Sequence, residues 1–208
     1  MSHSHVAYSH VPQLLFYTAS NGHSSFLCAR NILEEERTNS PRPGFIYLGA
    51  YNTNVLISPQ LDPASGKYKF VLPFTKSTKM PSIDPKNSTG PFVRALIEDE
   101  NAGTNLLAYD SKLSLGDMAT AWSKASGKEA DYVEVTTDFM HEKFGIPKQI
   151  LVGLDAMIEY GYMGGIDFIE PFQLKKQIHT KSLETWLNER DWSEVLDGSA
   201  KPTMRSME

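Results

Sequence analysis

The sequence predicts an α/β fold, in which short strands alternate with helices along one chain. Two observations predict it. Short apolar stretches alternate with longer segments in which apolar residues recur at helical spacing. Several of these helical segments also begin with a capping residue or end at a glycine.

The composition excludes several classes of protein. The chain has 208 residues, 40% of them apolar, and a net charge of -5, which is typical of a globular domain. Because no basic patch stands out, direct binding to nucleic acid is not expected. The single cysteine, Cys28, excludes an internal disulfide and a cysteine-built zinc site. Gly153 and Asp155 interrupt the longest apolar run, so no transmembrane helix is expected.

The N-terminal part of the chain has weaker signals. Residues 14–17 form a short apolar run that ends in a polar turn, which predicts a strand. Residues 26–36 have helical spacing and end before Pro41 and Pro43, which break helices. Residues 45–51 are expected to be another strand or the polar exit of one.

The next segment is rich in proline. Residues 58–91 hold six of the twelve prolines, so this segment is expected to be mostly loop. The one strand expected inside it covers residues 68–74.

From residue 89 onward the signals become regular. Residues 89–100 place Phe92, Val93, Leu96 and Ile97 on one face of a helix. In residues 113–128, Ser114 and Asp117 have capping-box spacing and Gly127 marks the end of the helix. The other expected elements are strands at 104–110 and 131–135, a helix at 137–145, and a last helix with Leu183, Trp186 and Leu187.

Pro147 is expected to open a longer helix. Its predicted apolar face consists of Ile150, Leu151, Leu154, Met157 and Ile158. Trp122 and Trp186 lie on apolar faces of other helices and are expected in the core. Residues 197–208 are expected to be a disordered tail.

Four stretches, in this order, resemble the NmrA-like family of atypical short-chain dehydrogenases. They are "RPGF" at 42–45, "LPF" at 72–74, "IDPKNSTGPFVRALIED" at 83–99 and "LSLGDMATAWSKASGKEADYVEV" at 113–135. Two later stretches, "IEYGYMGGIDF" at 158–168 and "KSLETWLNERDW" at 181–192, resemble the C-terminal region of fungal members, so the resemblance runs from about Pro41 to Trp192. It rests on the order and spacing of the stretches rather than on any single motif.

The resemblance implies an incomplete Rossmann-like NAD(P)-binding fold. Members of the family are longer and begin with a strand, a glycine-rich turn and a helix, whose backbone amides bind a pyrophosphate. No such glycine-rich motif occurs in these 208 residues. We therefore expect residues 1–57 to be the remnant of a nucleotide-binding half in an N-terminally truncated chain. Residues 58–196 would be the C-terminal region, on the substrate side of the cleft.

Residues 14–36 align with the family in two ways. They can match the first strand, turn and helix, with Thr18, Asn21 and Ser24 in place of the three glycines. They can also match the fifth strand and the helix after it, which then continues into "RPGF" without a further deletion. The second alignment is preferred for its continuity, and either one implies weakened dinucleotide binding.

The resemblance also implies site residues and a cofactor, NADP. Ordinary short-chain dehydrogenases use a Tyr with a Lys four residues later, and none of the nine tyrosines has this partner. Members of the family often carry a lone Lys instead, and Arg30 is the nearest basic residue to that position. The segment expected beside the nicotinamide is Gly44, Phe45, Ile46, Tyr47 and Leu48.

Two classes of function follow from the resemblance. One is an NAD(P)H-dependent oxidoreductase of fungal secondary metabolism, acting on a small molecule in the cytoplasm. The other is a non-enzymatic regulator that senses NAD(P) and binds a transcription factor, in the cytoplasm or the nucleus. No metal site is expected, because His3, His5 and His10 lie at a flexible start. An open sheet edge predicts self-association.

Overall fold

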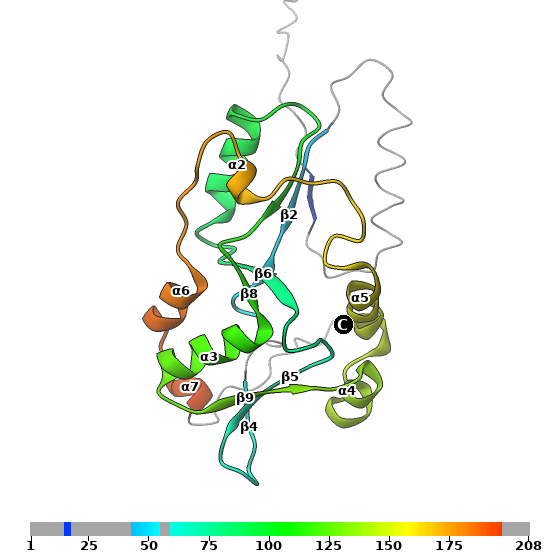
Figure 1. Ribbon diagram of the computed structural model, residues 1–208, viewed down its shortest axis with the longest axis vertical. Helices are drawn as coiled ribbons and strands as arrows, with labels where there is room; N and C mark the ends of the chain where they lie inside the picture. Colours follow the sequence, from blue (N-terminus) through cyan, green and yellow to red (C-terminus); the bar gives the residue numbers. More distant parts are fainter. Residues whose placement is uncertain (1–14, 18–42, 55–58, 197–208) are drawn as a thin grey trace, which may run out of the picture.

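The computed structural model describes residues 15–17, 43–54 and 59–196. Within these residues the strands form three small sheets, which follow one another along the long axis of the molecule (Figure 1). We call them the upper sheet (β1-β2-β7), the middle sheet (β3-β6-β8) and the lower sheet (β4-β5-β9). The predicted helix at 26–36 and tail at 197–208 lie outside the described residues.

The upper sheet is parallel. Its strands are β1 (Leu15–Tyr17), β2 (Phe45–Leu48) and β7 (Asn105–Ala108), with β2 in the centre. Ile46 pairs with Phe16 on one side and with Leu106 on the other. Ile169 forms a parallel bridge to Leu106, which adds the returning chain at the other edge of β7.

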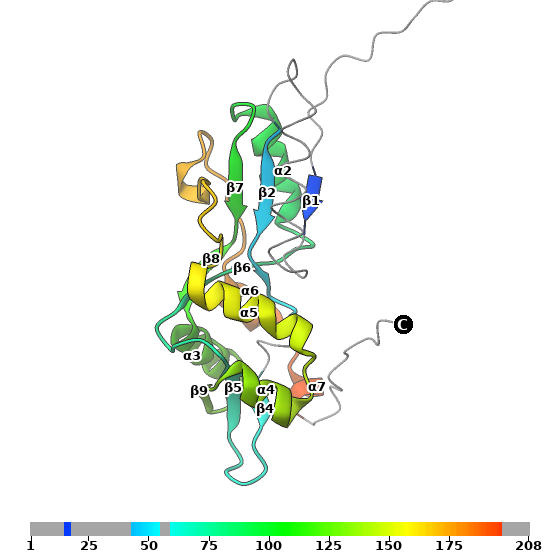
Figure 2. The same ribbon diagram turned by 90° about the vertical axis from the view of Figure 1, so that its right-hand side faces the viewer.

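Both faces of the upper sheet are covered, as is usual for parallel sheets. Ile46 and Leu106 pack against Phe92 and Leu96 of α2 (Thr89–Glu98), which lies behind the sheet in Figure 2. On the opposite face, the neighbouring residues Tyr47 and Leu107 pack with Met163 and with partly buried aromatic and aliphatic side chains of residues 162–168. Successive side chains of β2 and β7 point to opposite faces of the sheet, so these two strands contribute to a hydrophobic core on each face.

The described residues of the segment 58–91 are largely turns and loops, as predicted, but the middle sheet includes a strand within this segment that was not predicted. The middle sheet consists of β3 (Ala50–Tyr51), β6 (Lys79–Ile83) and β8 (Ser111–Ser114). The central strand β6 is parallel to β3 and antiparallel to β8. Proline content suggested a loop because Pro81 lies inside β6, but pairing with two strands distant in sequence forms this element.

The lower sheet carries the largest core. Its strands are β4 (Gln60–Leu61), β5 (Tyr68–Leu72) and β9 (Ala130–Glu134). Tyr68, Phe70 and Leu72 of β5 point inward and pack around Trp122 of α3 (Leu115–Ser126). The helices α6 (Leu183–Glu189) and α7 (Ser193–Leu196) complete this part, with Leu183, Leu187 and Trp192 buried in the same core.

The predicted helix ends are confirmed. Ser114 Oγ accepts a 3.0 Å hydrogen bond from the backbone amide of Asp117, and Gly127 ends α3 with a φ of 68°. Gly145 ends α4 (Thr137–Phe144) with a φ of 66°, and Thr136, which was not predicted as a cap, caps the start of this helix in the same way as Ser114. These ends depend on local chemistry that is visible in the sequence.

The predicted face of α5 (Lys148–Tyr160) is only partly correct. Leu151 is buried, and Leu154 and Met157 are half-buried against the cores. Ile150 and Ile158, however, are 41% and 51% exposed. The helix lies at the surface beside α4 (Figure 1). Only a narrow face of it therefore packs against the rest of the molecule, and Ile150 and Ile158 lie at the exposed margins of that face.

The two predicted core tryptophans differ in burial. Trp122 is 1% exposed, as predicted. Trp186 is only half-buried and packs against the edge of the lower core from the middle of α6. The guanidinium of Arg190 lies 5.0 Å from the ring centroids of both Trp186 and Trp192, a cation–π arrangement.

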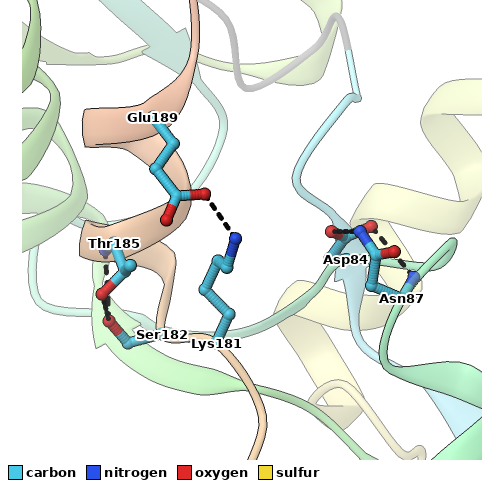
Figure 3. A network of polar contacts seen from close by, with 6 residues as sticks. All are labelled: Asp84, Asn87, Lys181, Ser182, Thr185 and Glu189. Carbon is cyan, nitrogen blue, oxygen red and sulfur yellow. Dashed lines mark hydrogen bonds and ion pairs between the residues drawn. The ribbon is translucent and has the colours of Figure 1, made fainter.

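Two polar turns set the starts of α2 and α6, and Figure 3 shows both. Asn87 donates from its side-chain amide to Asp84 Oδ2 at 2.6 Å in the turn that enters α2. Ser182 Oγ accepts from the backbone amide of Thr185 at 3.2 Å at the start of α6. Lys181 forms an ion pair with Glu189 at the other end of that helix.

The division at residue 57 stays a prediction. Strands from both sides of it share the upper and middle sheets. No helix of the part described is long and apolar enough to span a membrane.

Candidate functional site

The carboxyl ends of β2 and β7 meet at one edge of the upper sheet. The backbone amide of Gly49, directly after β2, donates to the Ala108 carbonyl at 2.9 Å. Ligands of parallel α/β sheets bind outside the carboxyl ends of the strands. We call the polar residues that follow β2 and β7 here the carboxyl-edge residues: Tyr51, Asn52, Tyr109 and Asp110. They form the candidate site.

Tyr109 belongs to a three-residue network. Its hydroxyl donates to Glu170 Oε2 at 2.6 Å, and Lys112 Nζ donates to Glu170 Oε1, also at 2.6 Å. The Lys112 ammonium also lies 5.8 Å from the centroid of the Tyr109 ring. Glu170 precedes the 3-10 helix η2 (Pro171–Gln173), so the network joins two segments that are distant in sequence.

The electrostatics of this network fix its protonation near neutral pH. Burial raises the pKa of Tyr109, and the hydrogen bond to the Glu170 carboxylate raises it further. Burial acts to raise the pKa of Glu170, but the hydrogen bonds from Lys112 and Tyr109 outweigh it and lower that pKa below the ordinary 4.5. Tyr109 is thus a neutral hydrogen-bond donor and Glu170 a carboxylate.

A second tyrosine hydroxyl, that of Tyr162, also donates a hydrogen bond at this edge. Tyr162 donates to the Leu48 carbonyl, the last of β2, at 2.9 Å. Burial raises the pKa of Tyr162, and the nearby Tyr51 adds to the effect. Burial likewise raises the pKa of Tyr51.

Asp110 anchors the turn that leads into α2. Its Oδ2 accepts from the backbone amide of Asp84 at 2.7 Å. Its other oxygen, Oδ1, is buried and has no hydrogen-bond partner within the described residues. Asp84 in turn accepts from the Lys86 amide at 3.1 Å.

The predicted site residues lie on or near β2. Gly44 precedes this strand, and a Cβ there would lie 2.6 Å from the Thr104 carbonyl oxygen, so a side chain would collide with the neighbouring chain. Ile46 and Tyr47 are buried on opposite faces of the sheet, whereas Phe45 and Leu48 are half-buried. Their contact with a cofactor stays a prediction. Arg30 lies outside the described residues.

The described residues form no open cradle for the pyrophosphate of a dinucleotide. Gly49, at the carboxyl end of β2, is close to the Pro81 carbonyl oxygen, which would lie 2.9 Å from a Cβ at that position. The absence of a side chain at Gly49 therefore lets two segments of the chain pack closely, and it does not open a cradle for a phosphate. The turn before α2 already holds the carboxylate of Asp84 against its amides, and this negative charge would repel a phosphate.

The search for Tyr with Lys four residues later missed the pair Tyr109 and Lys112. These residues are three apart, and β8 brings Lys112 back beside the tyrosine ring. A search at a spacing of three would have found the pair. Glu170 gives no local signal, because it lies 61 positions from Tyr109. The part of the chain that the structure describes contains no cluster of three or more side chains that could hold a metal ion.

The fold defines the class of protein: an α/β protein with a Rossmann-like parallel sheet. The sequence profile of the NmrA-like family matches residues 27–196, so the chain belongs to that family.

Solved structures share the fold. NmrA, a negative transcriptional regulator in complex with NADP, superposes with a TM-score of 0.55 at 20% identity, over 80% of this chain and 57% of that one. Leucoanthocyanidin reductase with NADPH from Vitis vinifera has a TM-score of 0.58 at 17% identity, over 80% and 59%.

A nucleoside-diphosphate-sugar epimerase from Staphylococcus aureus has a TM-score of 0.57 at 18% identity, over 85% of this chain and 64% of that one. The chain thus spans less than two thirds of the length of each of these proteins. A comparison with curated protein sequences gave no significant match.

Proposed function

We propose that this NmrA-like chain is a binding protein of the regulator type, which binds a ligand at the carboxyl-edge residues without chemical turnover. The observation that carries the proposal is the state of the tyrosines there. The hydroxyls of Tyr109 and Tyr162 both donate to fixed acceptors, Glu170 and the Leu48 carbonyl. Both have raised pKa values.

Ordinary short-chain dehydrogenases use a phenol that transfers a proton near neutral pH. Such a group works best when its pKa lies close to the working pH. A neighbouring ammonium lowers a phenol pKa, but here Lys112 is paired with Glu170. Burial and the Glu170 carboxylate instead raise the pKa of Tyr109, so the network suits hydrogen bonding rather than proton transfer.

The ligand class that we propose is an NADP-type dinucleotide, bound weakly. NmrA in complex with NADP and leucoanthocyanidin reductase with NADPH support this choice. The crowded surroundings of Gly49 and the carboxylate of Asp84 support low affinity. A transcription factor is the partner that follows from the regulator class, in the cytoplasm or the nucleus.

A turnover assay tests the proposal. The purified chain is mixed with NADPH and a panel of aldehydes, ketones and flavonoid substrates, and loss of NADPH absorbance is followed. We expect no rate above that of buffer. A rate that Tyr109→Phe abolishes and Tyr160→Phe leaves unchanged would identify an oxidoreductase and overturn the proposal. Tyr160 is a suitable control because it is 59% exposed on α5.

A further inference from the structure

A small cavity lies between the turn after β3 and the core of the lower sheet. Its volume is about 30 Å³. Asn52 and Pro59 line it on one side, and aromatic and aliphatic side chains of β5, α3, α6 and the following loop line the rest. These are Phe70, Met118, Trp122, Leu183, Leu187 and Trp192.

Two of the lining side chains carry buried polar atoms without partners. Asn52 is 6% exposed and Trp122 is 1% exposed. Within the part of the chain described, the Asn52 Nδ2 and Oδ1 atoms and the Trp122 Nε1 atom have no hydrogen-bond partner. The neighbouring Trp192 differs, because its Nε1 donates to the Leu187 carbonyl at 3.0 Å.

The chemistry of these atoms defines what would satisfy them. The indole of Trp122 is a donor only, whereas the Asn52 amide offers donors and an acceptor. A group that pairs with both must accept a hydrogen bond and donate one, as a water molecule or a hydroxyl does. The requirement is the same if the oxygen and nitrogen of the Asn52 amide are exchanged.

The size of the cavity is sufficient for a water molecule. A buried water needs roughly 10–15 Å³ of cavity and at least two polar partners. The cavity of about 30 Å³ is large enough for one water, and two of the residues that line it, Asn52 and Trp122, carry the unpaired polar atoms. Leaving the amide and the indole unsatisfied would cost stability, because buried polar groups in native proteins are almost always paired.

We propose that this cavity is a hydration site, in which ordered water bridges the Asn52 amide and the Trp122 indole N–H. Asn52 lies just beyond the carboxyl ends of β2 and β3, whereas Trp122 lies at the centre of the lower core. The water therefore links the candidate site to the core of the lower sheet by hydrogen bonds. The other side chains that line the cavity offer it only apolar contacts.

Water-to-indole magnetisation transfer, measured by NMR on the nitrogen-labelled full chain, tests this site. The three indole N–H signals are assigned with Trp122→Phe and Trp192→Phe. We expect a cross-peak between long-lived water and the Trp122 indole, and none at the Trp192 indole, which is bonded to Leu187. Absence of the Trp122 cross-peak would overturn the proposal.

A variant locates the water against Asn52. Asn52→Leu keeps the approximate shape of the side chain and removes its polar atoms, so the Trp122 cross-peak should disappear while the other indole signals keep their positions. A cross-peak of unchanged strength in Asn52→Leu would show that the water does not bridge the two residues. If Asn52→Leu does not fold, the comparison of Trp122 with Trp192 in the natural chain decides the matter.

Discussion

The hydroxyl of Tyr109 and the carboxylate of Glu170 form a 2.6 Å hydrogen bond that joins the end of β7 to the chain 61 positions later. Because the pKa of Glu170 is lowered in the folded chain, the charged carboxylate contributes stability. This contribution is fully present above the ordinary pKa of 4.5 and is lost as the pH falls through the lowered value.

We therefore expect denaturant titrations from pH 7 down to pH 3 to show a smaller loss of stability for Glu170→Gln than for the natural chain. Glu98→Gln is the control, because Glu98 forms only an exposed helix pair with Arg94. Equal acid sensitivity of the natural chain and Glu170→Gln would contradict the role assigned to this carboxylate.

Adjacent positions on α5 separate the buried face from the exposed one. Leu151 is 3% exposed, whereas Val152 is 61% exposed. Leu151→Ala should lower the free energy of unfolding by about 2–5 kcal/mol, because it leaves a cavity. Val152→Ala should change it by less than about 0.5 kcal/mol. Similar losses in urea denaturation of both variants would show that α5 is oriented differently.

Two glycines should respond to alanine in opposite directions. Gly153 lies inside α5, and a Cβ there would meet nothing within 4 Å. Gly153→Ala should therefore raise the free energy of unfolding by about 0.5–1 kcal/mol. Gly127 ends α3 with a φ of 68°, where a side chain costs about 1–2 kcal/mol. Gly127→Ala should accordingly lower the melting temperature, while Gly153→Ala raises it.

Calorimetric titration with NADP should give a dissociation constant weaker than about 1 µM, that is, a binding free energy smaller than about 8 kcal/mol. The physical reason is that the described residues offer no open glycine turn to the pyrophosphate, and that Asp84 fills the turn before α2. Tighter binding would place the phosphate contacts in the segment around Arg30, and Arg30→Ala should then weaken it.

The helices could be predicted well because their signals are local. Ser114, Gly127, Thr136 and Gly145 act within a few residues of their own position. Trp122 could be placed in the core for the same reason, since its helix has a wide apolar face.

The middle sheet could not be predicted, because long-range pairing creates it. β6 contains Pro81 and reads locally as a loop, yet it pairs with β3 and β8. The sequence predicts no strand at residues 111–114, which form β8 directly before the cap at Ser114. The Lys112–Glu170 ion pair depends on that strand. The periodicity of the sequence therefore could not predict this part of the candidate site.

The bridge from Leu106 to Ile169 and the packing of Leu174 and Trp192 have a consequence for synthesis of the chain. Leu174 belongs to the core under α2, and Trp192 belongs to the core around Trp122. When α5 has just left the ribosome, both cores therefore still lack side chains that complete them. Such long-range closure is slow and exposes apolar surface in the meantime. The segment from Leu174 to Trp192 therefore closes both cores, and their apolar surface stays exposed until this segment has left the ribosome.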